Sequence, residues 1–449
     1  MYAIANSILQ VDGRSLIARL FDYRVNSLFW HVLKIENMIT APYLSIVAAA
    51  RNDNHGGNML RRMQIFINGV ITQSRRYQLP IELIIVEWNP PADQPQLSEA
   101  LTWNVKDSPC VVRVIEVPNH LHQQLRHSAS LPLFQMIAKN VGIRRATGEF
   151  VLATNIDLLF SDALFEFLAL RPLHPGKSYR VDRYDVTSDV PPETSIEEQL
   201  AYCDRSIIRI NHKDGIEELI ETKRTEQTIR DSISPPPTQK WYEKIPQSTL
   251  PKLANLRQIY KRLLPTLVKD TILSFLPKDL QIWLIERGLL TTQPIPISLE
   301  SIEVDRLSQQ SWQYPQLHTI ASGDFTLFSK ADWFKIRGYT EWEMYSLHLD
   351  SVLLYTSHYA GIEEEILSND MRVYHIEHSS GWTPEVERSQ VIDKRLSSLG
   401  VPKLSLEQLD AIVRLMHQLG KPILFNDENW GLSQHALPET VIDPVNLQH

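Results

Sequence analysis

Cysteine, excess basic charge and long apolar runs are all scarce in this sequence. Only two cysteines, Cys110 and Cys203, occur among 449 residues; their spacing does not resemble a metal site, and their rarity favours a reducing compartment. The net charge is −8 at pH 7, which argues against general nucleic-acid binding because that function needs a basic face. No stretch reaches the roughly 18 apolar residues of a spanning helix, and the N-terminus lacks the basic start of a secretion signal. We therefore expect a cytoplasmic protein, either soluble or peripheral on the inner face of the membrane.

The composition is that of a globular chain, since 43% of the residues are hydrophobic and a chain of this length can bury a large core. Segments typical of strands and helices alternate from Tyr43 to Asp157, which predicts an α/β fold with a mainly parallel, doubly wound sheet. We expect an N-terminal extension at 1–40, a catalytic domain in two halves at 41–190 and 297–385, a helical insertion at 191–296, and a helical C-terminal extension at 386–449. The segment 179–186 is typical of a strand, and 406–419 is typical of an amphipathic helix that begins with a capping box of Ser405 and Gln408.

The stretch 138–162, AKNVGIRRATGEFVLATNIDLLFSD, combines a helix, a turn, a strand and an acidic loop. Gly148 ends the helix, and the apolar run 150–153 is typical of a strand that is buried on both faces. Asp157 follows this strand, at the edge where open α/β sheets bind ligands. Hard oxygen ligands in that position suit Mg²⁺ or Mn²⁺ carrying a diphosphate. The alternative is that Asp157 caps a helix beginning at Ser161.

The run A-K-N-x-G-x-x-x-A-x-G-E-F-V-x-x-x-x-x-D resembles the central signature of GT-A nucleotide-sugar glycosyltransferases, in which the strand ends in an Asp-x-Asp metal motif. Asn155 replaces the first acid of that motif, and Asp157 keeps the second. The resemblance implies a GT-A, Rossmann-like fold and makes Asp157 a ligand of Mn²⁺ or Mg²⁺. It also assigns Asn140 and Asn155 to the donor site, where Asn155 would offer the sugar a neutral oxygen or an amide donor.

Two other strand ends belong to the donor half at 41–190. The strand at 43–50 leads into a polar loop with two glycines and then a helix at 59–73, which is typical of the first βα turn of a nucleotide-binding domain. In the resembled enzymes this loop holds the base and ribose, which implies donor-binding roles for Ala49, Arg51 and Asp53. For Asp53 the alternative is a helix cap. Glu87 follows the strand at 81–86, and the resemblance assigns it to the nucleoside.

The insertion at 191–296 is charged, punctuated by proline and helical in period. Its segment 252–264 is amphipathic, so it either packs on the domain or lies on a bilayer surface. Because the donor motifs lie outside the insertion, we expect it to serve acceptor or membrane recognition.

The acceptor half at 297–385 contains a turn of small residues, 321–323, which allows close backbone approach to a ligand. The later run His348-Leu-Asp350 resembles the acceptor-side motif of GT-A enzymes, with leucine in place of the first of two acids. This resemblance assigns Gly323, Asp324 and His348 to acceptor and sugar binding, and Asp350 to the catalytic base. An acid at a helix start is also often only an N-cap, which is the alternative for Asp350.

The strand at 371–377 carries His375, and His378 lies at its end. In the resembled enzymes a histidine on this strand completes the metal site that the Asp-x-Asp motif begins. His375 matches best by strand position, and His378 is the alternative.

The resemblance implies a metal-dependent glycosyltransferase of the hexosyl-transferring class, acting in cell-surface polysaccharide or glycolipid synthesis. It would use a nucleoside diphosphate sugar, with UDP favoured over GDP, and a saccharide or lipid-linked acceptor. Asn155 and Leu349 also admit a catalytically inactive sugar-nucleotide-binding protein. A nucleotidylyltransferase is a third interpretation, although its usual basic, glycine-rich phosphate loop is poorly matched by ARNDNHGG. Inversion is expected if Asp350 is the base, and retention stays open if it only holds the acceptor.

Overall fold

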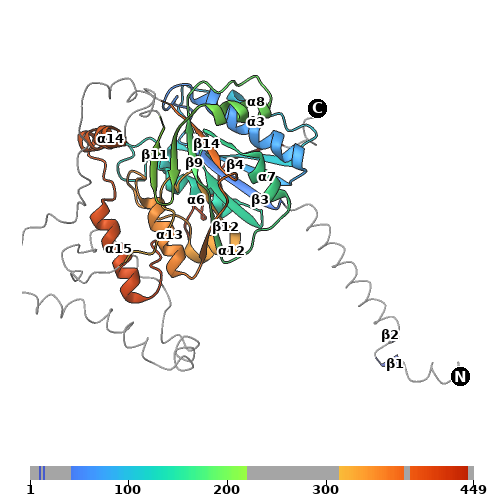
Figure 1. Ribbon diagram of the computed structural model, residues 1–449. Helices are drawn as coiled ribbons and strands as arrows, with labels where there is room; N and C mark the ends of the chain where they lie inside the picture. The colour runs from blue at the N-terminus through green and yellow to red at the C-terminus, as the bar shows by residue number, and fades with distance from the viewer. Residues whose placement is uncertain (1–9, 12–13, 16–41, 220–312, 379–384, 443–449) are drawn as a thin grey trace, which may run out of the picture. The chain divides into compact units, whose positions relative to one another are not determined.

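The computed structural model describes residues 10–11, 14–15, 42–219, 313–378 and 385–442 (Figure 1). These residues form a mixed α/β fold around an eight-stranded, mostly parallel sheet, which confirms the predicted fold class at this level. Of the predicted N-terminal extension, only the paired strands β1 (Gln10–Val11) and β2 (Arg14–Ser15) are described. The predicted insertion lies outside the described residues from 220 onward, including its amphipathic segment 252–264.

The large sheet places the ends of several parallel strands at one edge. Its order is β13 (Glu363–Ile366), β8 (Lys177–Arg180), β12 (Phe325–Ser329), β6 (Phe150–Thr154), β3 (Leu44–Ala50), β4 (Ile81–Trp88), β5 (Cys110–Val117) and β15 (Glu439–Ile442). Strands β6, β3, β4 and β5 run parallel, whereas β12 is antiparallel to β6. The loops that follow β3, β4 and β6 therefore emerge on the same side, where the sequence predicts the ligand site.

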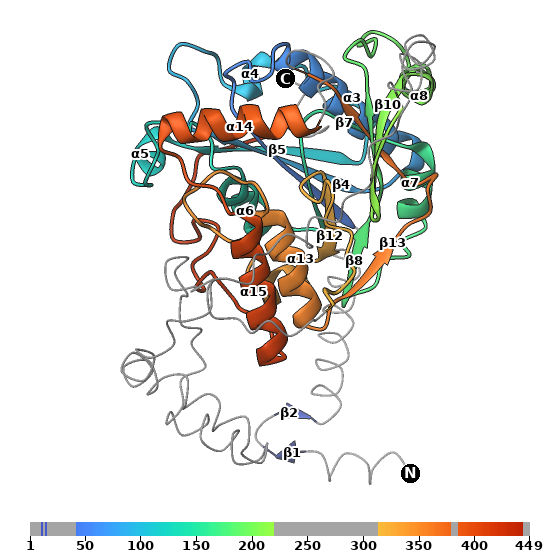
Figure 2. The same ribbon diagram turned by 60° about the vertical axis from the view of Figure 1, so that its left-hand side comes forward.

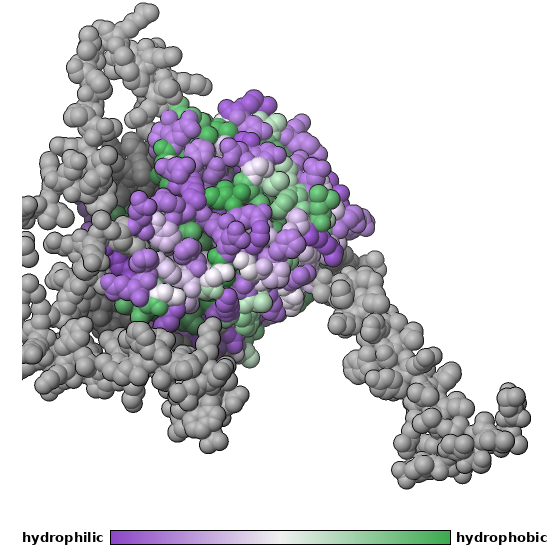
Figure 3. Space-filling model, turned by 60° about the horizontal axis from the view of Figure 1, so that its bottom comes forward, coloured by the Kyte–Doolittle hydropathy of each residue, from purple (hydrophilic) through white to green (hydrophobic). Residues whose placement is uncertain are grey.

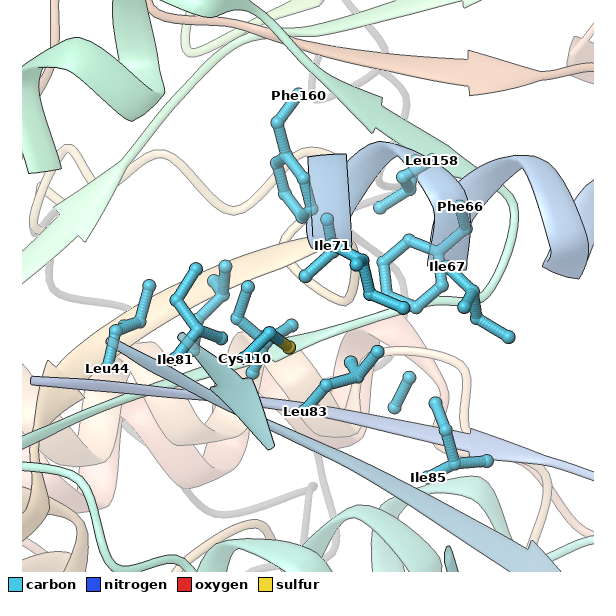
Figure 4. Close-up of a cluster of buried hydrophobic side chains, with 14 of the residues drawn as sticks. Leu44, Phe66, Ile67, Ile71, Ile81, Leu83, Ile85, Cys110, Leu158 and Phe160 are labelled. Atoms are coloured by element: carbon cyan, nitrogen blue, oxygen red, sulfur yellow. The ribbon is translucent and has the colours of Figure 1, made fainter. Parts of the chain in front are cut away.

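Both faces of this sheet are buried, which explains the nearly continuous apolar runs of its central strands. In β3, Leu44 and Ile46 pack toward α3 (Met59–Tyr77) and α7 (Asp162–Ala169). Val47 and Ala49 pack on the other face, with α6 (Gln135–Arg145) and the helices of the C-terminal half. Figure 4 shows the first of these cores, in which side chains of β3, β4 and β5 meet those of α3.

Gly142 lets α6 approach the sheet closely. A Cβ at this position would lie 2.4 Å from Val47 Cγ1 and 3.1 Å from Val86 Cγ2. We expect Gly142→Ala to lower the free energy of unfolding by about 1–3 kcal/mol, because overpacking outweighs the better helix propensity of alanine. Urea unfolding checks this. The matched control is Gly69→Ala in α3. There the new methyl would crowd only the flexible end of Leu159 and would make an ordinary contact with Ile196 Cδ1 at 3.7 Å, so this change should cost less. Equal stability of Gly142→Ala and the wild type would contradict this account of the packing.

A second, five-stranded sheet has the order β11 (Gly215–Glu218), β10 (Ile207–His212), β9 (Arg183–Val186), β14 (Val373–Ile376) and β7 (Leu158–Phe160). The segment 179–186, read from the sequence as one strand, is divided between β8 of the large sheet and β9 of this one. Residues 191–219, assigned to the helical insertion, contain α8 (Ile196–Arg205) and strands β10 and β11. The backbone pairing of β10 and β11 makes these two strands part of the small sheet.

The C-terminal half covers the other face of the large sheet with helices. These are α12 (Lys330–Ile336), α13 (Leu349–Tyr359) and α15 (Leu406–Leu419), and α13 lies beside α15 (Figure 2). The predicted capping box of Ser405 and Gln408 is confirmed at the start of α15. The other helices in the described part of the chain are α4 (Leu97–Ala100), α5 (Asn119–His122) and α14 (Glu385–Leu399). After α15 the chain buries Trp430 and ends its described part in β15, at the edge of the sheet.

Hydrophilic residues cover most of the coloured surface in Figure 3, and hydrophobic residues form smaller patches among them. Among the residues that the structure describes, no helix combines the length and the apolar character needed to cross a bilayer.

Candidate metal and donor site

The two sheets bring one carboxylate and two imidazoles together. Asp157 lies between β6 and β7, and the pairing of β14 with β7 sets His375 opposite Leu158. Asp157 Oδ2 is 3.7 Å from His375 Nε2 and 3.5 Å from His378 Nε2. One ligand atom from each of the three residues lies within 4.8 Å of the ligand atoms of the other two. The structure therefore places both candidate histidines beside Asp157.

The buried carboxylate of Asp185 orients the His375 ring by contacting Nδ1, the ring nitrogen that does not face Asp157. Asp185 Oδ1 lies 3.1 Å from His375 Nδ1, and Asp185 Oδ2 lies 3.2 Å from Arg209 Nη1. If Nδ1 carries the proton toward Asp185, the lone pair of Nε2 points to Asp157, which is the arrangement of a metal-binding histidine. Burial opposes the charge of His375, but the carboxylates of Asp157 and Asp185 outweigh it and raise the pKa of this imidazole.

The ligand atoms fit a divalent ion. Asp157 is 8% exposed, and its Oδ1 atom is buried without a hydrogen-bond partner among the described residues. A buried acceptor of this kind normally has a partner, so the orphaned oxygen is consistent with an ion. The alternative role of Asp157 as a helix cap is not observed, because the Ser161 hydroxyl accepts the hydrogen bond from Leu164 N–H at the start of α7.

The loop after β3 carries an ion pair that is accessible to a ligand. Arg51 Nε donates to the Asn89 carbonyl at 2.8 Å, and Arg51 Nη1 pairs with Asp53 Oδ2 at 2.9 Å. Asp53 does not cap α3; Asn54 Oδ1 accepts from Met59 N–H instead. Asp53 and Arg51 thus lie together where the sequence predicts donor contacts. Ala49, the third predicted donor contact here, is 8% exposed in β3.

Glu87 differs from its predicted position. It lies inside β4, not after it, and is only 1% exposed. Its two carboxylate oxygens accept from Leu97 N–H at 3.1 and 3.0 Å. Glu87 therefore closes the loop between β4 and α4, and does not present its carboxylate to a ligand. Burial raises the pKa of Glu87 from its usual 4.5 to about 7, although the Leu97 N–H opposes this shift.

This raised pKa makes Glu87 a source of pH dependence. Between its unfolded and folded pKa values, only the folded protein holds the proton, so stability falls as the pH rises through this window by up to about 3 kcal/mol. Glu87→Gln keeps an acceptor for Leu97 N–H and removes the charge. We expect this variant to be more stable than the wild type at about pH 8 and to lose the advantage at about pH 5, as measured by urea unfolding. Nucleotide affinity should not change. A folded variant that binds nucleotide poorly would restore the donor role implied by the resemblance.

Asn140, assigned to the donor site, is fully buried, and its side-chain amide forms hydrogen bonds within the protein. Its Nδ2 donates to the Tyr339 carbonyl at 2.8 Å and to Glu341 Oε1 at 2.9 Å, and its Oδ1 accepts from Tyr339 N–H at 2.8 Å. Asn140 thus fastens residues 338–341 to α6, which is a structural role and not a contact with a donor.

Asn155 links the donor strand to the acceptor half. Its Oδ1 accepts from Gln135 Nε2 at 2.9 Å, and its Nδ2 donates to Asp324 Oδ1. Arg183 Nη1 donates to the other oxygen of Asp324 at 2.6 Å. Burial opposes the charge of Asp324, but Arg183 and His375 outweigh it and lower the pKa of this carboxyl. Asp324 is therefore ionised and already paired.

Asp350 lies in the first turn of α13, next to the small-residue turn. Its Oδ2 accepts from the Ser322 hydroxyl at 2.7 Å, and its Oδ1 accepts from Ser351 N–H at 2.9 Å. A Cβ at Gly323 would lie 3.4 Å from Asp350 Oδ2. The N-cap position of α13 belongs to His348, whose φ is 65°, so Asp350 is not the cap. Burial lowers the pKa of His348.

Lys139 was not selected from the sequence, yet its ammonium contacts the small-residue turn at Gly323. It is fully buried, and its Nζ donates to the Gly323 carbonyl at 2.6 Å. Burial lowers its pKa to about 8, while attraction to the carboxylates of Asp324, Asp350 and Asp157 opposes that shift. The predicted base and the predicted metal ligand therefore interact with the same buried ammonium. The signal in the sequence is the lysine of the A-K-N run, which lies close to apolar residues in the predicted helix.

No protein-family model matches this chain, and no curated protein matches it either. The resemblance to GT-A enzymes therefore rests on the sequence motifs.

Proposed function

We propose that this protein is a metal-dependent glycosyltransferase that moves a sugar from a nucleoside diphosphate sugar to a saccharide or lipid-linked acceptor. The observation that carries the proposal is the cluster of Asp157, His375 and His378 at the end of a parallel strand. Asp350 lies at the turn 321–323, where Ser322 donates to it and the Gly323 carbonyl accepts from Lys139. A GT-A architecture, the use of UDP, and Mn²⁺ or Mg²⁺ as the ion are parts of the same proposal.

In this proposal Asp157, His375 and His378 hold the divalent ion, which would neutralise charge on the departing diphosphate. Arg51 and Asp53 contact the nucleoside from the loop after β3. Asp350 accepts the proton of the acceptor hydroxyl while the oxygen of that hydroxyl bonds to the anomeric carbon and the bond to the diphosphate breaks. Ser322 and the Ser351 N–H hold the Asp350 carboxylate in place. The proposal assigns acceptor contacts to Gly323, where a Cβ would lie 3.4 Å from Asp350 Oδ2, and to His348 at the N-cap of α13.

The test is incubation of the full-length protein with a panel of nucleoside diphosphate sugars, with Mn²⁺, with Mg²⁺ and with a chelator. Metal-dependent release of nucleoside diphosphate, which an added saccharide acceptor accelerates, is the expected result. Release of pyrophosphate from a sugar phosphate and a nucleoside triphosphate would favour a nucleotidylyltransferase instead. Tight binding of a nucleotide sugar without any release would indicate an inactive binding protein.

A further inference from the structure

Arg62 of α3 points a buried guanidinium at the candidate metal cluster. The residue is 3% exposed, and its Nε lies 3.9 Å from Asp157 Oδ2. Neither Arg62 Nε nor Asp157 Oδ1 has a hydrogen-bond partner among the described residues. Two orphaned polar atoms of opposite charge therefore belong to neighbouring side chains, in a part of the molecule where unmet hydrogen-bonding capacity is costly.

The rest of the guanidinium fixes the loop that supports His378. Arg62 Nη2 donates to the His55 carbonyl at 2.8 Å, and Nη1 donates to the Gly57 carbonyl. Gly56, between these two residues, has a φ of +69° and touches His378 so closely that a Cβ would lie 2.4 Å from Nδ1 of that ring. Arg62 thus contacts both the carboxylate ligand and the backbone that packs against an imidazole ligand.

The charges of this arrangement disfavour a lone divalent cation. Asp157 is the one acidic ligand of the cluster, and Arg62 already offsets its charge. Arg62 is also attracted to the buried Glu377, so a divalent ion added to Arg62, Asp157 and Glu377 leaves an excess of about one positive charge, in surroundings that screen it weakly. A diphosphate supplies the opposite charge. Arg62 repels the divalent ion when the ion binds alone. When a diphosphate binds to the ion, its negative charge attracts Arg62, so the ion and the diphosphate bind together more favourably.

We propose that Arg62 makes metal binding conditional on the nucleotide: its charge weakens the binding of a divalent ion alone and strengthens the binding of the ion together with a nucleoside diphosphate. The proposal rests on the proposed function, because it assumes a diphosphate as the second ligand. By linkage, the ion then raises the affinity for the diphosphate by the same factor as the diphosphate raises that for the ion.

The experiment measures free Mn²⁺ by its electron paramagnetic resonance signal during titration of the full-length protein, alone and with saturating UDP or GDP. In the wild type, we expect the diphosphate to tighten Mn²⁺ binding. Arg62→Gln removes the charge but keeps a donor for the loop carbonyls. In this variant, Mn²⁺ alone should bind on the order of 10-fold more tightly, and the tightening by the diphosphate should shrink by a similar factor or more. Arg62→Lys keeps the charge and should preserve the coupling.

The matched control is Arg61→Gln, which alters the neighbouring arginine of α3. Arg61 donates to the Ser188 and Val190 carbonyls and, within the described residues, forms no ion pair with Asp157. Wild-type values in Arg62→Gln, or the same change in Arg61→Gln, would overturn the proposal. So would loss of coupling in a folded Arg62→Lys, because its charge is retained. Circular dichroism establishes that each variant is folded. Failure of the wild type to bind Mn²⁺ even with a diphosphate would instead refute the proposed function, so the two failures are distinguishable.

Discussion

Asp157→Asn is expected to abolish Mn²⁺ binding and, with it, the metal-dependent binding of a nucleoside diphosphate. Asparagine has nearly the same shape but lacks the charge that attracts a divalent ion to two neutral imidazoles. The Mn²⁺ affinity should fall by more than about 100-fold, beyond the 10- to 100-fold that loss of an outer-shell partner costs. Asp157→Ala should have the same effect on the ion.

The fold should survive both changes. Asp157 Oδ1 makes no hydrogen bond within the described residues, and only the attraction of Oδ2 to Arg62 and the two histidines is lost. We expect the free energy of unfolding to fall by no more than about 1–3 kcal/mol. Calorimetric titration with Mn²⁺ and a nucleoside diphosphate measures the binding. Asp162→Asn is the control, since that nearby acid faces Arg76 at the surface. Unchanged Mn²⁺ affinity in Asp157→Asn would exclude a metal role for Asp157.

The position of the candidate site was predictable because it depends on local patterns. A short apolar run followed by an acid predicts a buried strand end. The run 150–153 with Asp157 after it predicts such an end, and the observed strand β6 ends at Thr154. The amphipathic period and the capping box likewise located α15, from Leu406 to Leu419. These features need only neighbouring residues. Together they were enough to predict the parallel sheet and the edge on which the cluster lies.

Side-chain partners that are distant in the sequence were not predictable in this way. The strand before Glu87 was expected to end at Val86, but β4 continues to Trp88 because it pairs with β5 over its full length. This difference of two residues moves Glu87 from a strand end into the sheet. Asn140 meets Tyr339, which is 199 residues away along the chain. A motif position alone does not reveal whether such an amide faces a ligand or another loop.

The charged residues around the metal cluster were missed for the same reason. Arg62, Arg183 and Asp185 lie in segments that read from the sequence as an ordinary helix and an ordinary strand. They become significant only when β9 pairs with β14 and α3 packs against β7. The register of β14 with β9 sets His375 opposite Asp185, which creates the support for the imidazole.

Asp350→Asn is expected to lower the rate of sugar transfer on the order of 10²- to 10⁴-fold, the usual cost of losing a general base. Asparagine should retain the local structure, because its Oδ1 can still accept from Ser351 N–H and its amide can still bond the Ser322 hydroxyl. The fold and the affinity for the nucleoside diphosphate should therefore stay close to wild type, and the loss should appear in kcat more than in KM. Single-turnover transfer with a radiolabelled donor sugar measures the step directly.

His348→Gln is the comparison, because the neighbouring imidazole is the other group in this turn that accepts protons, and its pKa is lowered by burial. Asp324 is a weaker rival, since Arg183 and Asn155 already occupy its oxygens. If Asp350→Asn transfers sugar at close to the wild-type rate while His348→Gln does not, the base is His348, and Asp350 only holds Ser322 and the start of α13.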